Sequence, residues 1–408
     1  MEKIKVLFIG NKVPFPDLDG GTAASRAMIQ NILDAGCTVQ AVFFDTEKHP
    51  VRSEALFPEW HDPAFSLEKI RVDTRVNLRD ALLNLFFSTK SYHIIRVQKS
   101  IVQKQLQAIT EKFVPDIIIL DGLFALAQAP FLKSVTRAPL VYRAHNIESE
   151  IWFRLAGHSR FSPKKRYLHI LAKRLQKFEK KTAHLLRDVW AVSEPTAQFF
   201  AALKVPARVV YPSFRLQSHE APHEQYTGHG PFRMFHVGSM DWQPNTEAVA
   251  FFVKDIFPQL RRQFPLVEFH AGGRHFDVDA FPETEGVFYY GEIEDYRAFT
   301  ADKHALVVPL LSGSGIRMKI PEAWAAGIPV LATPAAIRGI PAEPDVHFGM
   351  FSNTAELLAL CRAWLESPEY WKKLSQNGRR QVEELFSHEA LAKSVGEYIA
   401  DIVRLDKK

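Results

Sequence analysis

Glycines and cations are concentrated in one short stretch of the second half of the chain. A β-branched run at 305–309 is followed by a loop with Gly313 and Gly315, and then by Arg317 and Lys319. Glycine lets backbone N–H groups approach an anion closely, and a helix N-terminus adds the positive end of its dipole. Cations in the first turn of a helix are electrostatically unfavourable on their own. Two of them at this place predict a bound dianion such as a diphosphate.

Glu322 follows Lys319 by three positions on a helix expected over 316–326, so the two side chains can lie on one side of it. A carboxylate one turn beyond a phosphate site can accept hydrogen bonds from vicinal hydroxyls, as on a ribose. The simpler interpretation is a Gly-rich turn followed by a surface ion pair. The position of the cations at the helix start favours the ligand interpretation.

Other polar residues follow strands expected in the first half of the chain. His145, Asn146 and Glu148 come directly after one such strand, and Gly20 and Gly21 follow the first. Ligands of open parallel sheets bind beyond the carboxyl ends of the strands, so these residues are expected to point into a cleft. The alternatives are a plain strand-to-helix turn at the glycines and a helix N-cap at Asn146.

The elements that must position these residues alternate between short strands and helices from end to end, which is typical of an α/β fold with parallel sheets. Helices are expected between the strands, for example at 22–35 and 98–113, and a helical tail is expected over 353–405. The expected strands are 4–9, 38–44, 116–120, 139–144, 188–192 and 207–211, followed by 232–238, 267–272, 287–291, 305–309 and 329–333.

The alternation breaks once, at 213–231, where periodicity is lost and His, Gly and Pro accumulate. Such composition indicates a linker. We therefore predict an N-terminal Rossmann-like domain over 1–212 and a C-terminal one over 232–387.

The segment GSGIRMKIPEAWAAGIPVLATP at 313–334 resembles the nucleotide-sugar signature of retaining GT-B glycosyltransferases, family 4 (group 1) in particular. The resemblance covers nearly the whole chain. It implies two doubly wound domains that face each other across a cleft, the first on the acceptor side and the second on the donor side. It also implies a C-terminal helix, 388–408, that packs back on the N-terminal domain. In the family's Glu-x7-Glu motif the second Glu holds the donor ribose; that residue is Glu322 here, and Ser314 stands at the first position.

The resemblance also assigns donor contacts outside this segment. The loop 235–245 lacks the Arg and Lys that bind phosphate in the family, so Arg317 and Lys319 are expected to take over that role. Arg274 is expected near the base or the phosphates, and the backbone at Ile293 is expected to hold the base. The expected donor-binding residues are Gly20, Gly21, Gly238, Ser239, Arg274, Ile293, Gly313, Ser314 and Gly315.

On the acceptor side, the resemblance makes His145 the main catalytic-site residue of the first domain, where it positions the sugar. Asn146 and Glu148 are expected to contact the sugar or the acceptor. The apolar segment 78–97 adds Tyr92 and Arg96 as acceptor contacts, with a core helix as the alternative.

Together these assignments predict the reaction that the protein catalyses. The resemblance implies transfer of a sugar, with retention, from a nucleotide-diphospho-sugar to a glycan or lipid-linked acceptor, in bacterial surface polysaccharide synthesis. The catalytic set is His145, Arg317, Lys319 and Glu322, without a cofactor and without a metal, since fixed cations replace it. Asp277-Val-Asp279 spells the DxD of another fold but follows the wrong kind of element. The alternatives are a nucleotide-sugar epimerase and a catalytically silent GT-B subunit, which the Ser at position 314 keeps open.

Composition and charge narrow the partners. The chain has 408 residues, 47% of them hydrophobic and 24% charged, which excludes a disordered or coiled-coil protein. The segment 160–187 is strongly basic with an apolar stripe at helical spacing. It is either a domain helix with a solvated basic face or a contact to anionic lipid. Its few aromatic residues argue against nucleic acid. With no apolar run near membrane-spanning length, we expect a cytoplasmic protein that can also lie on the inner face of the plasma membrane.

Overall fold

The computed structural model describes residues 3–14, 20–47, 62–158, 162–214, 226, 229–313 and 315–406. The chain divides into two compact units. Unit 1 consists of Met1–Phe214 together with His388–Lys408, and unit 2 of Arg215–Ser387.

Unit 1 is built on a parallel sheet of seven strands in the order β3-β2-β1-β4-β5-β6-β7. Five of the six strands expected here are buried along nearly all their length, as their apolar runs predict. The sequence missed β3, an edge strand whose polar residues alternate with less exposed ones and leave no continuous apolar run. The strands are β1 (Lys5–Gly10), β2 (Thr38–Asp45), β3 (Phe65–Arg71), β4 (Ile117–Asp121), β5 (Leu140–Ala144), β6 (Asp188–Ala191) and β7 (Ala207–Val209).

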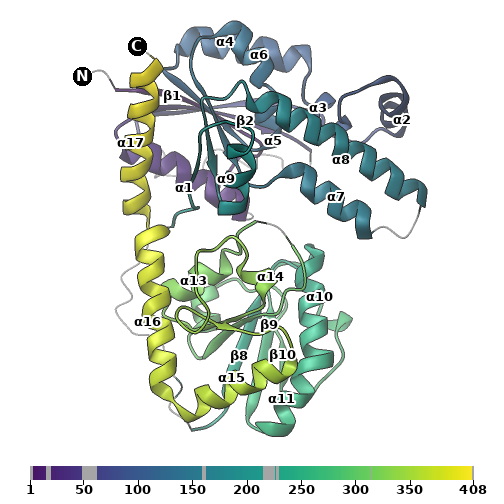
Figure 1. The fold of residues 1–408 in the computed structure, drawn as a ribbon, viewed down its shortest axis with the longest axis vertical. Coiled ribbons are helices and arrows are strands. Elements are labelled where there is room, and N and C mark those ends of the chain that lie inside the picture. Colours follow the sequence, from purple (N-terminus) through teal and green to yellow (C-terminus); the bar gives the residue numbers. More distant parts are fainter. Residues whose placement is uncertain are drawn as a thin grey trace. The chain divides into compact units, whose positions relative to one another are not determined.

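Helices cover both faces of this sheet, and each face has its own core (Figure 1). On one face, α1 (Gly20–Asp34) and α17 (His388–Asp406) lie side by side, and Met28 and Val395 belong to the same buried cluster. His388 at the start of α17 also contacts Asp34, with Nε2 2.5 Å from Oδ2. The last helix therefore completes unit 1, although unit 2 precedes it in the chain.

The other face of the unit 1 sheet carries the helices between β3 and β7. The apolar residues of most of these helices belong to the largest buried cluster of unit 1. Ala81 of α2 instead packs with Tyr92 and Leu171 in a small cluster of its own. These helices are α2 (Leu78–Phe87), α3 (Tyr92–Ile95), α4 (Ser100–Phe113), α5 (Leu123–Leu126), α6 (Ala129–Val135), α7 (Glu148–His158), α8 (Ser162–Ala183) and α9 (Glu194–Ala201).

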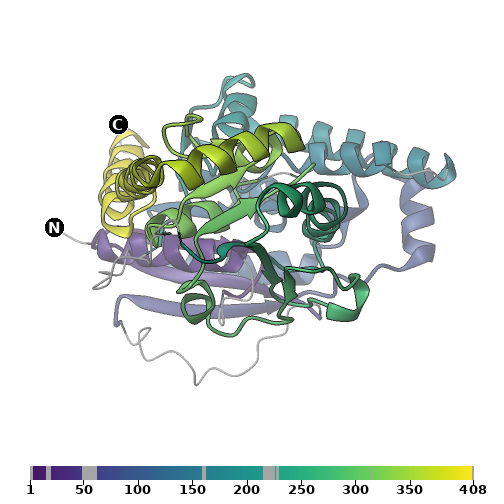
Figure 2. The ribbon, with the colours of Figure 1, turned by 90° about the horizontal axis from the view of Figure 1, so that it is seen from below.

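Unit 2 has a parallel sheet of six strands in the order β10-β9-β8-β11-β12-β13, with helices around it (Figure 2). The five strands expected from the sequence are confirmed; the sequence missed β13, which has only two residues. The strands are β8 (Phe232–Val237), β9 (Val267–Gly272), β10 (Val287–Tyr289), β11 (Ala305–Val308), β12 (Val330–Ala332) and β13 (Gly349–Met350).

The helices of unit 2 correct two expectations. The tail expected as one helical stretch is three helices, because turns at Ser367 and Phe386 interrupt it. The helix expected over 316–326 begins only at Lys319, after a loop in which Gly313 and Gly315 adopt positive φ. The helical elements are α10 (Gln243–Phe251), η2 (Phe252–Ile256), α11 (Phe257–Gln263), η3 (Val278–Ala280), α12 (Tyr296–Thr300), α13 (Lys319–Ala325), α14 (Pro334–Ile337), α15 (Thr354–Glu366) and α16 (Pro368–Leu385).

Two features bear on the environment of the protein. The expected basic helix is α8, with Leu171 and Leu175 buried on its apolar side and its lysines exposed. Among the helices of the described ranges, none combines the length and the apolar composition that crossing a membrane requires.

Candidate functional site

In unit 2, the loops that follow two neighbouring strands meet at the carboxyl edge of the sheet. Gly238 and Ser239 follow β8, and the Gly-rich loop before Lys319 follows β11, which pairs with β8. Lys319 joins the two loops, because its Nζ donates to Oδ1 of Asn245 at 2.9 Å. The same Nζ lies 3.1 Å from Nε2 of His236, the penultimate residue of β8. The structure thus brings together residues that lie 74 and 83 positions apart in the sequence.

The hydrogen bonds of His236 fix which ring nitrogen carries the proton. Nδ1 lies 2.8 Å from the carbonyl oxygen of Val307, which can only accept, so Nδ1 is the donor. The lone pair on Nε2 is left to accept from Lys319. Burial and the charge of Lys319 lower the pKa of His236 to about 3, so the imidazole is neutral near pH 7.

Lys319 is a cation in an unfavourable environment. Burial and the neighbouring charge of Arg317 lower its pKa to about 7, against a smaller opposing effect of Glu322. Its hydrogen-bond partners among the described residues, His236 and Asn245, are both uncharged. An anion placed beside Lys319 would stabilise the ammonium form, which makes this position suited to a phosphate.

Arg317 is held in the loop just before α13. Its side chain is 5% exposed, and its guanidinium carbon lies 5.2 Å from the ring centroid of Trp242. It also donates to the carbonyl oxygen of Gly315. A side chain at position 313 would collide with it, since a Cβ there would come within 2.6 Å of the guanidinium, and Gly313 has a φ of +128°. The glycine is therefore needed for this arginine to lie along the loop.

The backbones of the β8 and β9 loops approach each other closely. Gly273 has a φ of +137°, and a Cβ there would lie 2.2 Å from the carbonyl oxygen of Gly238. A Cβ on Gly238 would in turn lie 2.8 Å from Nζ of Lys319. Beyond this contact, Nε of Arg274 donates to Oγ of Ser239 at 3.3 Å. The expected donor residues Gly238, Ser239 and Arg274 thus belong to one cluster with Lys319.

The residues expected near the base form the next part of the same edge. The N–H of Gly273 donates to the carbonyl of Gly291 at 2.7 Å, and a Cβ on Gly272 would lie 2.8 Å from Cδ1 of Ile293. Ile293 therefore packs against the β9 loop. Tyr296, at the start of α12, has a buried hydroxyl with no hydrogen-bond partner among the described residues. Burial and the charge of Glu322, whose side chain is exposed, raise the pKa of Tyr296.

In unit 1, His145 belongs to a buried charged cluster at the carboxyl ends of β4 and β5. Its Nε2 lies 2.6 Å from Oδ1 of Asp121, which also accepts from NH1 of Arg143 at 2.9 Å. The second carboxylate oxygen accepts from the hydroxyl of Ser25 on α1. Because a carboxylate oxygen can only accept, Nε2 of His145 carries a proton and donates to Asp121.

The charges of this cluster compensate one another. Arg143 is fully buried and Asp121 nearly so, whereas the side chain of His145 is 23% exposed. Burial opposes the ionisation of Asp121, but the charges of His145 and Arg143 outweigh it and lower the pKa of the carboxyl. The cluster therefore holds His145 in one orientation with an edge open to solvent.

Glu148 belongs to another cluster of unit 1, an acidic pair with Glu179 at the start of α7. Its N–H donates to Oε1 of Glu179 on α8 at 2.8 Å, and the N–H of Ser149 donates to Oε2 at 3.3 Å. Glu179 thus satisfies the first amides of α7. Burial raises the pKa of Glu148 and of Glu179 to about 7 each, and the charge of Glu179 adds to the rise at Glu148.

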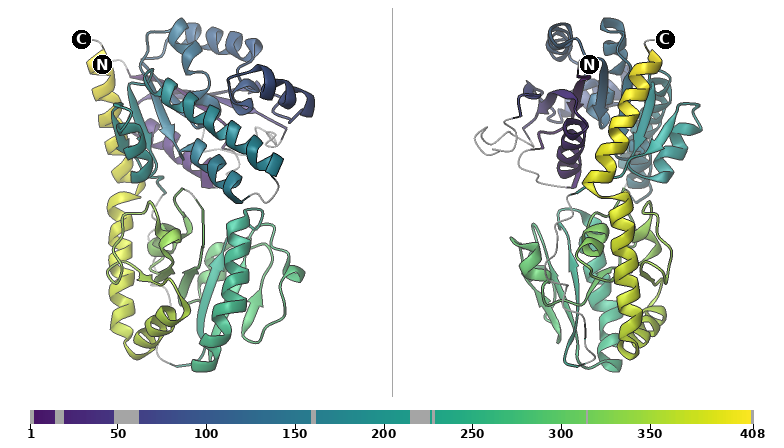
Figure 3. Two further views of the ribbon diagram at one scale, coloured as in Figure 1. Left: turned by 45° about the vertical axis from the view of Figure 1, so that its right-hand side comes forward. Right: turned by 90° about the vertical axis from the view of Figure 1, so that its left-hand side faces the viewer.

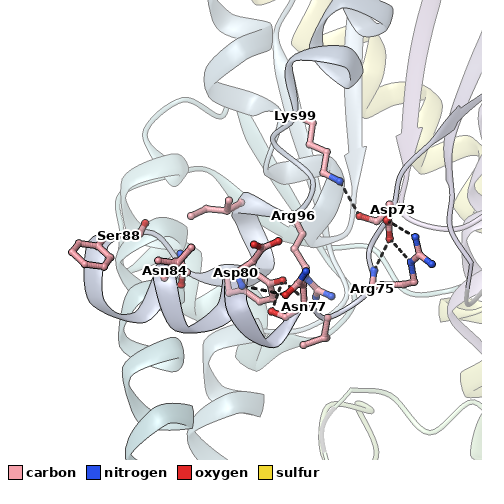
Figure 4. Close-up of a pocket in the computed structure, with 13 residues that line it drawn as sticks. Asp73, Arg75, Asn77, Asp80, Asn84, Ser88, Arg96 and Lys99 are labelled. Atoms are coloured by element: carbon pink, nitrogen blue, oxygen red, sulfur yellow. Dashed lines mark hydrogen bonds and ion pairs between the residues drawn. The ribbon is translucent and has the colours of Figure 1, made fainter.

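Tyr92 and Arg96 line a cavity of about 700 Å³ between α2 and α3 (Figure 4). Tyr92 is mostly buried, and its hydroxyl accepts from the N–H of Asn77 at 3.2 Å and lies 3.4 Å from the carbonyl oxygen of the same residue. Arg96 is half-buried and reaches the cavity wall. His93, between them, packs against Trp152 of α7 with ring centroids 4.2 Å apart and the rings tilted by 34°, which ties α3 to the helix that follows His145.

The remaining expectations have mixed outcomes. Gly20 and Gly21 are the first residues of α1, so their backbone is helical rather than left-handed. Asn146 is half-buried beside His145. Ser314 lies outside the described residues. Reasoning from the sequence left several residues out of the site. Asp121 ends β4, directly after its apolar run, so a search of strand ends would have included it. Asn245 lies in the first turn of α10 and gives no such signal. The other residues left out are Ser25, Arg143, His236, Trp242 and Tyr296.

The expectation on metals concerns carboxylates and histidines. Within the described ranges, no group of three His, Cys, Asp or Glu side chains is placed to hold a metal ion. Asp277 of the DxD triplet accepts from the N–H of Asp279 at 3.2 Å and so caps the short helix η3.

Comparison with known proteins agrees with this picture. Residues 231–363 match the family model described as Glycosyl transferases group 1. This range lies within unit 2 and contains the cluster around Lys319. No curated protein matches the chain in a sequence comparison.

Solved structures resemble the whole chain. Sucrose-phosphate synthase from Thermosynechococcus elongatus has a TM-score of 0.69 at 16% identity, over 99% of this chain and 100% of that one. HepE from Anabaena, in complex with UDP, has a TM-score of 0.64 at 13% identity, over 98% and 100%. The lipopolysaccharide outer core galactosyltransferase WaaB, in its apo form, has a TM-score of 0.63 at 14% identity, over 98% and 99%. The chain thus has the GT-B fold with two Rossmann-like domains, and with the group 1 match over 231–363 this supports a GT-B glycosyltransferase.

Proposed function

We propose that the protein transfers a sugar from a nucleotide-diphospho-sugar to a glycan or lipid-linked acceptor. The observation that carries this proposal is the cluster around Lys319. In it, two cations, Lys319 and Arg317, lie beside glycine loops whose backbone N–H groups a ligand can approach closely. The solved complexes of HepE with UDP and with UDP-glucose, on the same fold, support a uridine nucleotide-sugar as the first donor to test.

The cluster gives each residue a role in the proposed reaction. Lys319 and Arg317 bind the diphosphate and stabilise the charge that develops on it as the bond from the anomeric carbon to oxygen breaks. Glu322 accepts hydrogen bonds from the ribose, with Tyr296 and Ile293 on the base side. His145, oriented by Asp121, positions the transferred sugar. Fixed side-chain cations can supply this stabilisation, so we propose that the reaction needs no metal.

Three finer parts of the proposal come from the resemblance of the 313–334 segment. They are retention of the anomeric configuration, membership of family 4, and a role in bacterial surface polysaccharide synthesis at the cytoplasmic side of the membrane. The lipopolysaccharide galactosyltransferase among the similar folds agrees with the last of these.

Nucleotide binding is the first test, measured as thermal shift with UDP, GDP, ADP and CMP. Ligand at 100 times its dissociation constant adds about 2.7 kcal/mol to the free energy of unfolding, which gives a clear shift. We expect one nucleoside diphosphate to stabilise the wild type and to have a much smaller effect on Lys319→Ala and Glu322→Ala. Lys254→Ala, an exposed lysine of η2, is the matched control and should behave as the wild type. If none of the four nucleotides shifts the melting temperature of the wild type, the proposal is contradicted.

Turnover of the donor separates the proposed reaction from its alternatives. Donor incubated alone gives a new isomer only if the protein is an epimerase. Nucleotide binding without turnover in a screen of acceptors would indicate a silent subunit. NMR of the product anomer tests retention, and activity in excess EDTA tests metal independence.

A further inference from the structure

The outer face of α2 is apolar although it faces solvent. Leu78 is 78% exposed, Phe86 74% and Phe87 85%, and Leu82 and Leu83 are each about half exposed or more. Several large apolar side chains exposed together on one helix are typical of an interaction surface, whereas single exposed ones are normal.

The structure holds α2 firmly in this orientation. Asn77 caps its start by accepting from the N–H of Arg79 at 2.9 Å. At its end, Arg174 of α8 donates to the carbonyl oxygens of Asn84 at 3.0 Å and Leu85 at 2.8 Å. Ala81 and Asn84 form the buried side. The apolar face is therefore presented outward by a capped helix that is anchored on α8.

Cations flank this apolar face. The helix α8 lies beside α2 in Figure 1 and in the left view of Figure 3, and Arg174 joins the two. The only acid within α8, Glu179, is buried, so the exposed surface of the helix is positive. Its exposed cations are Lys164, Lys165, Arg166, Lys173, Lys177, Lys180 and Lys181.

The cavity behind α2 combines the same two properties. Leu83, Phe87 and Ile95 give it an apolar wall, and Arg96 and Lys99 reach it from the α3 side (Figure 4). Two acids, Asp73 and Asp80, also line it. An amphiphile, with a charged head and an apolar tail, is the ligand that such a lining fits.

Neither Arg96 nor Lys99 is hydrogen-bonded to a carboxylate among the described residues. Arg96 donates to the carbonyl oxygen of Thr74 and lies 3.1 Å from Nδ1 of His93, and Lys99 donates to the carbonyl oxygen of Asp73 at 3.2 Å. The carboxylate of Asp73 is instead bound by Arg75, through Nε at 3.1 Å and NH2 at 3.0 Å. Among the described residues, the hydrogen-bond partners of Arg96 and Lys99 are thus uncharged, which suits them to an anionic group.

We infer that α2 docks on an anionic lipid bilayer, with Phe86 and Phe87 in the hydrocarbon region and the anionic head of one lipid bound by Arg96 and Lys99 in the cavity. The exposed lysines of α8 add attraction to the charged surface. The inference assigns insertion to α2 and a defined lipid site to the α2–α3 cavity, and reduces α8 to a supporting electrostatic role. It does not depend on the proposed function.

Sedimentation with vesicles tests the inference on the full chain. The vesicles are phosphatidylcholine alone or phosphatidylcholine with phosphatidylglycerol. We expect the wild type to bind the anionic vesicles and not the neutral ones. Phe86→Ser with Phe87→Ser should weaken binding at least about tenfold, because two buried aromatic side chains are lost. Lys99→Gln should weaken it about fivefold, as expected for one cation near an anionic surface.

Matched controls use exposed residues of unit 2. Leu266→Ser removes an exposed leucine and Lys372→Gln an exposed lysine, and both variants should bind as the wild type. Unchanged melting temperatures of all variants show that they fold. Equal binding of the double Phe variant and the wild type would overturn the inference, as would equal binding to neutral and anionic vesicles.

Two other occupants are distinguished by the same samples. Glycerol phosphate that stabilises the wild type, without any binding to vesicles, would show a soluble anion site and overturn lipid docking. A dimer in size-exclusion chromatography that the double Phe variant loses, again without vesicle binding, would show that a second copy covers α2. A failed nucleotide shift together with vesicle binding would count against the proposed function alone.

Discussion

The two units each place cations at the carboxyl edge of a parallel sheet, but they treat the charge in opposite ways. In unit 1, Arg143 and His145 share the carboxylate of Asp121. In unit 2, Lys319 is bound by the uncharged side chains of His236 and Asn245, and Arg317 lies close enough to lower its pKa.

The difference separates positioning from binding. A buried cation with its own carboxylate is electrostatically complete and gains little from a further anion. A cation with neutral partners keeps an unfavourable charge that a phosphate can offset. We therefore expect the unit 1 cluster to hold a side chain in place and the unit 2 cluster to recognise a ligand.

Breaking the compensated cluster should have the largest effect. Asp121→Asn leaves the fully buried Arg143 without its counter-charge, and removing one partner of a buried pair costs about 3–5 kcal/mol of the free energy of unfolding. Denaturant unfolding measures the loss. Asp401→Asn, at an exposed pair with Arg404, is the control and should change stability by less than about 1 kcal/mol. Similar losses in both variants would mean that the cluster is not a stabilising unit.

Breaking the uncompensated cluster should affect turnover rather than stability. Arg317→Ala with Lys319→Ala removes two charges from the proposed leaving-group site, and loss of such contacts lowers kcat by about 10²–10³-fold. Steady-state donor turnover measures the effect, with denaturant unfolding as the companion measurement. Because burial already disfavours the charge of Lys319, the free energy of unfolding should not fall as it does in Asp121→Asn. A kcat equal to that of the wild type would contradict the assigned role.

The pH dependence of nucleotide binding should sharpen the contrast. The pKa of Lys319 is lowered to about 7 without ligand, so the ammonium form is present below pH 7 and is lost above it. A bound diphosphate raises that pKa, so binding takes up a proton above pH 7 and the affinity falls by up to about tenfold per pH unit. Calorimetric titration between pH 6 and pH 9 measures this slope. Lys319→Met should bind the nucleotide weakly at every pH, and its affinity should not change with pH in this way. If the affinity of Lys319→Met still falls above pH 7, another group takes up the proton.

The acidic pair in unit 1 should show the smallest effect. Glu148 and Glu179 have pKa values raised to about 7 in the folded protein, above those of an unfolded chain. Between the unfolded pKa and pH 7 the folded state therefore binds more protons, and stability falls as the pH rises. Glu148→Gln removes one acid, so the melting temperature should rise at pH 8 and stay unchanged at pH 4. The rise should be worth about 1–2 kcal/mol, because solvent screens part of the raised pKa of a half-buried side chain. A gain that is equal at both pH values would point to packing instead of charge.

Much of the fold followed from local pattern. The apolar runs of eleven strands and the break near 213–231 predict a doubly wound α/β protein, because parallel strands buried on both faces must be continuously apolar. The two strands that were missed lack this signal. One is the edge strand β3, with alternating polar residues, and the other, β13, has only two residues.

The candidate site was only partly predictable. Gly313, Arg317, Lys319 and Glu322 stand in one segment with a signal of its own, and they remain the centre of the site. His236 was hidden because a histidine within an apolar strand gives no local sign of its partner. Its role exists only because β11 pairs beside β8 and aims Lys319 at it.

Local patterns in the chain were enough to predict which strands form and which loops carry glycine and positive charge. Those properties depend on neighbours in the chain. Tertiary structure alone decided which charges are compensated, since Asp121 meets His145 across 24 positions and Lys319 meets His236 across 83. It also decided that the apolar face of α2 points outward, because only the anchoring of that helix on α8 determines which side is buried.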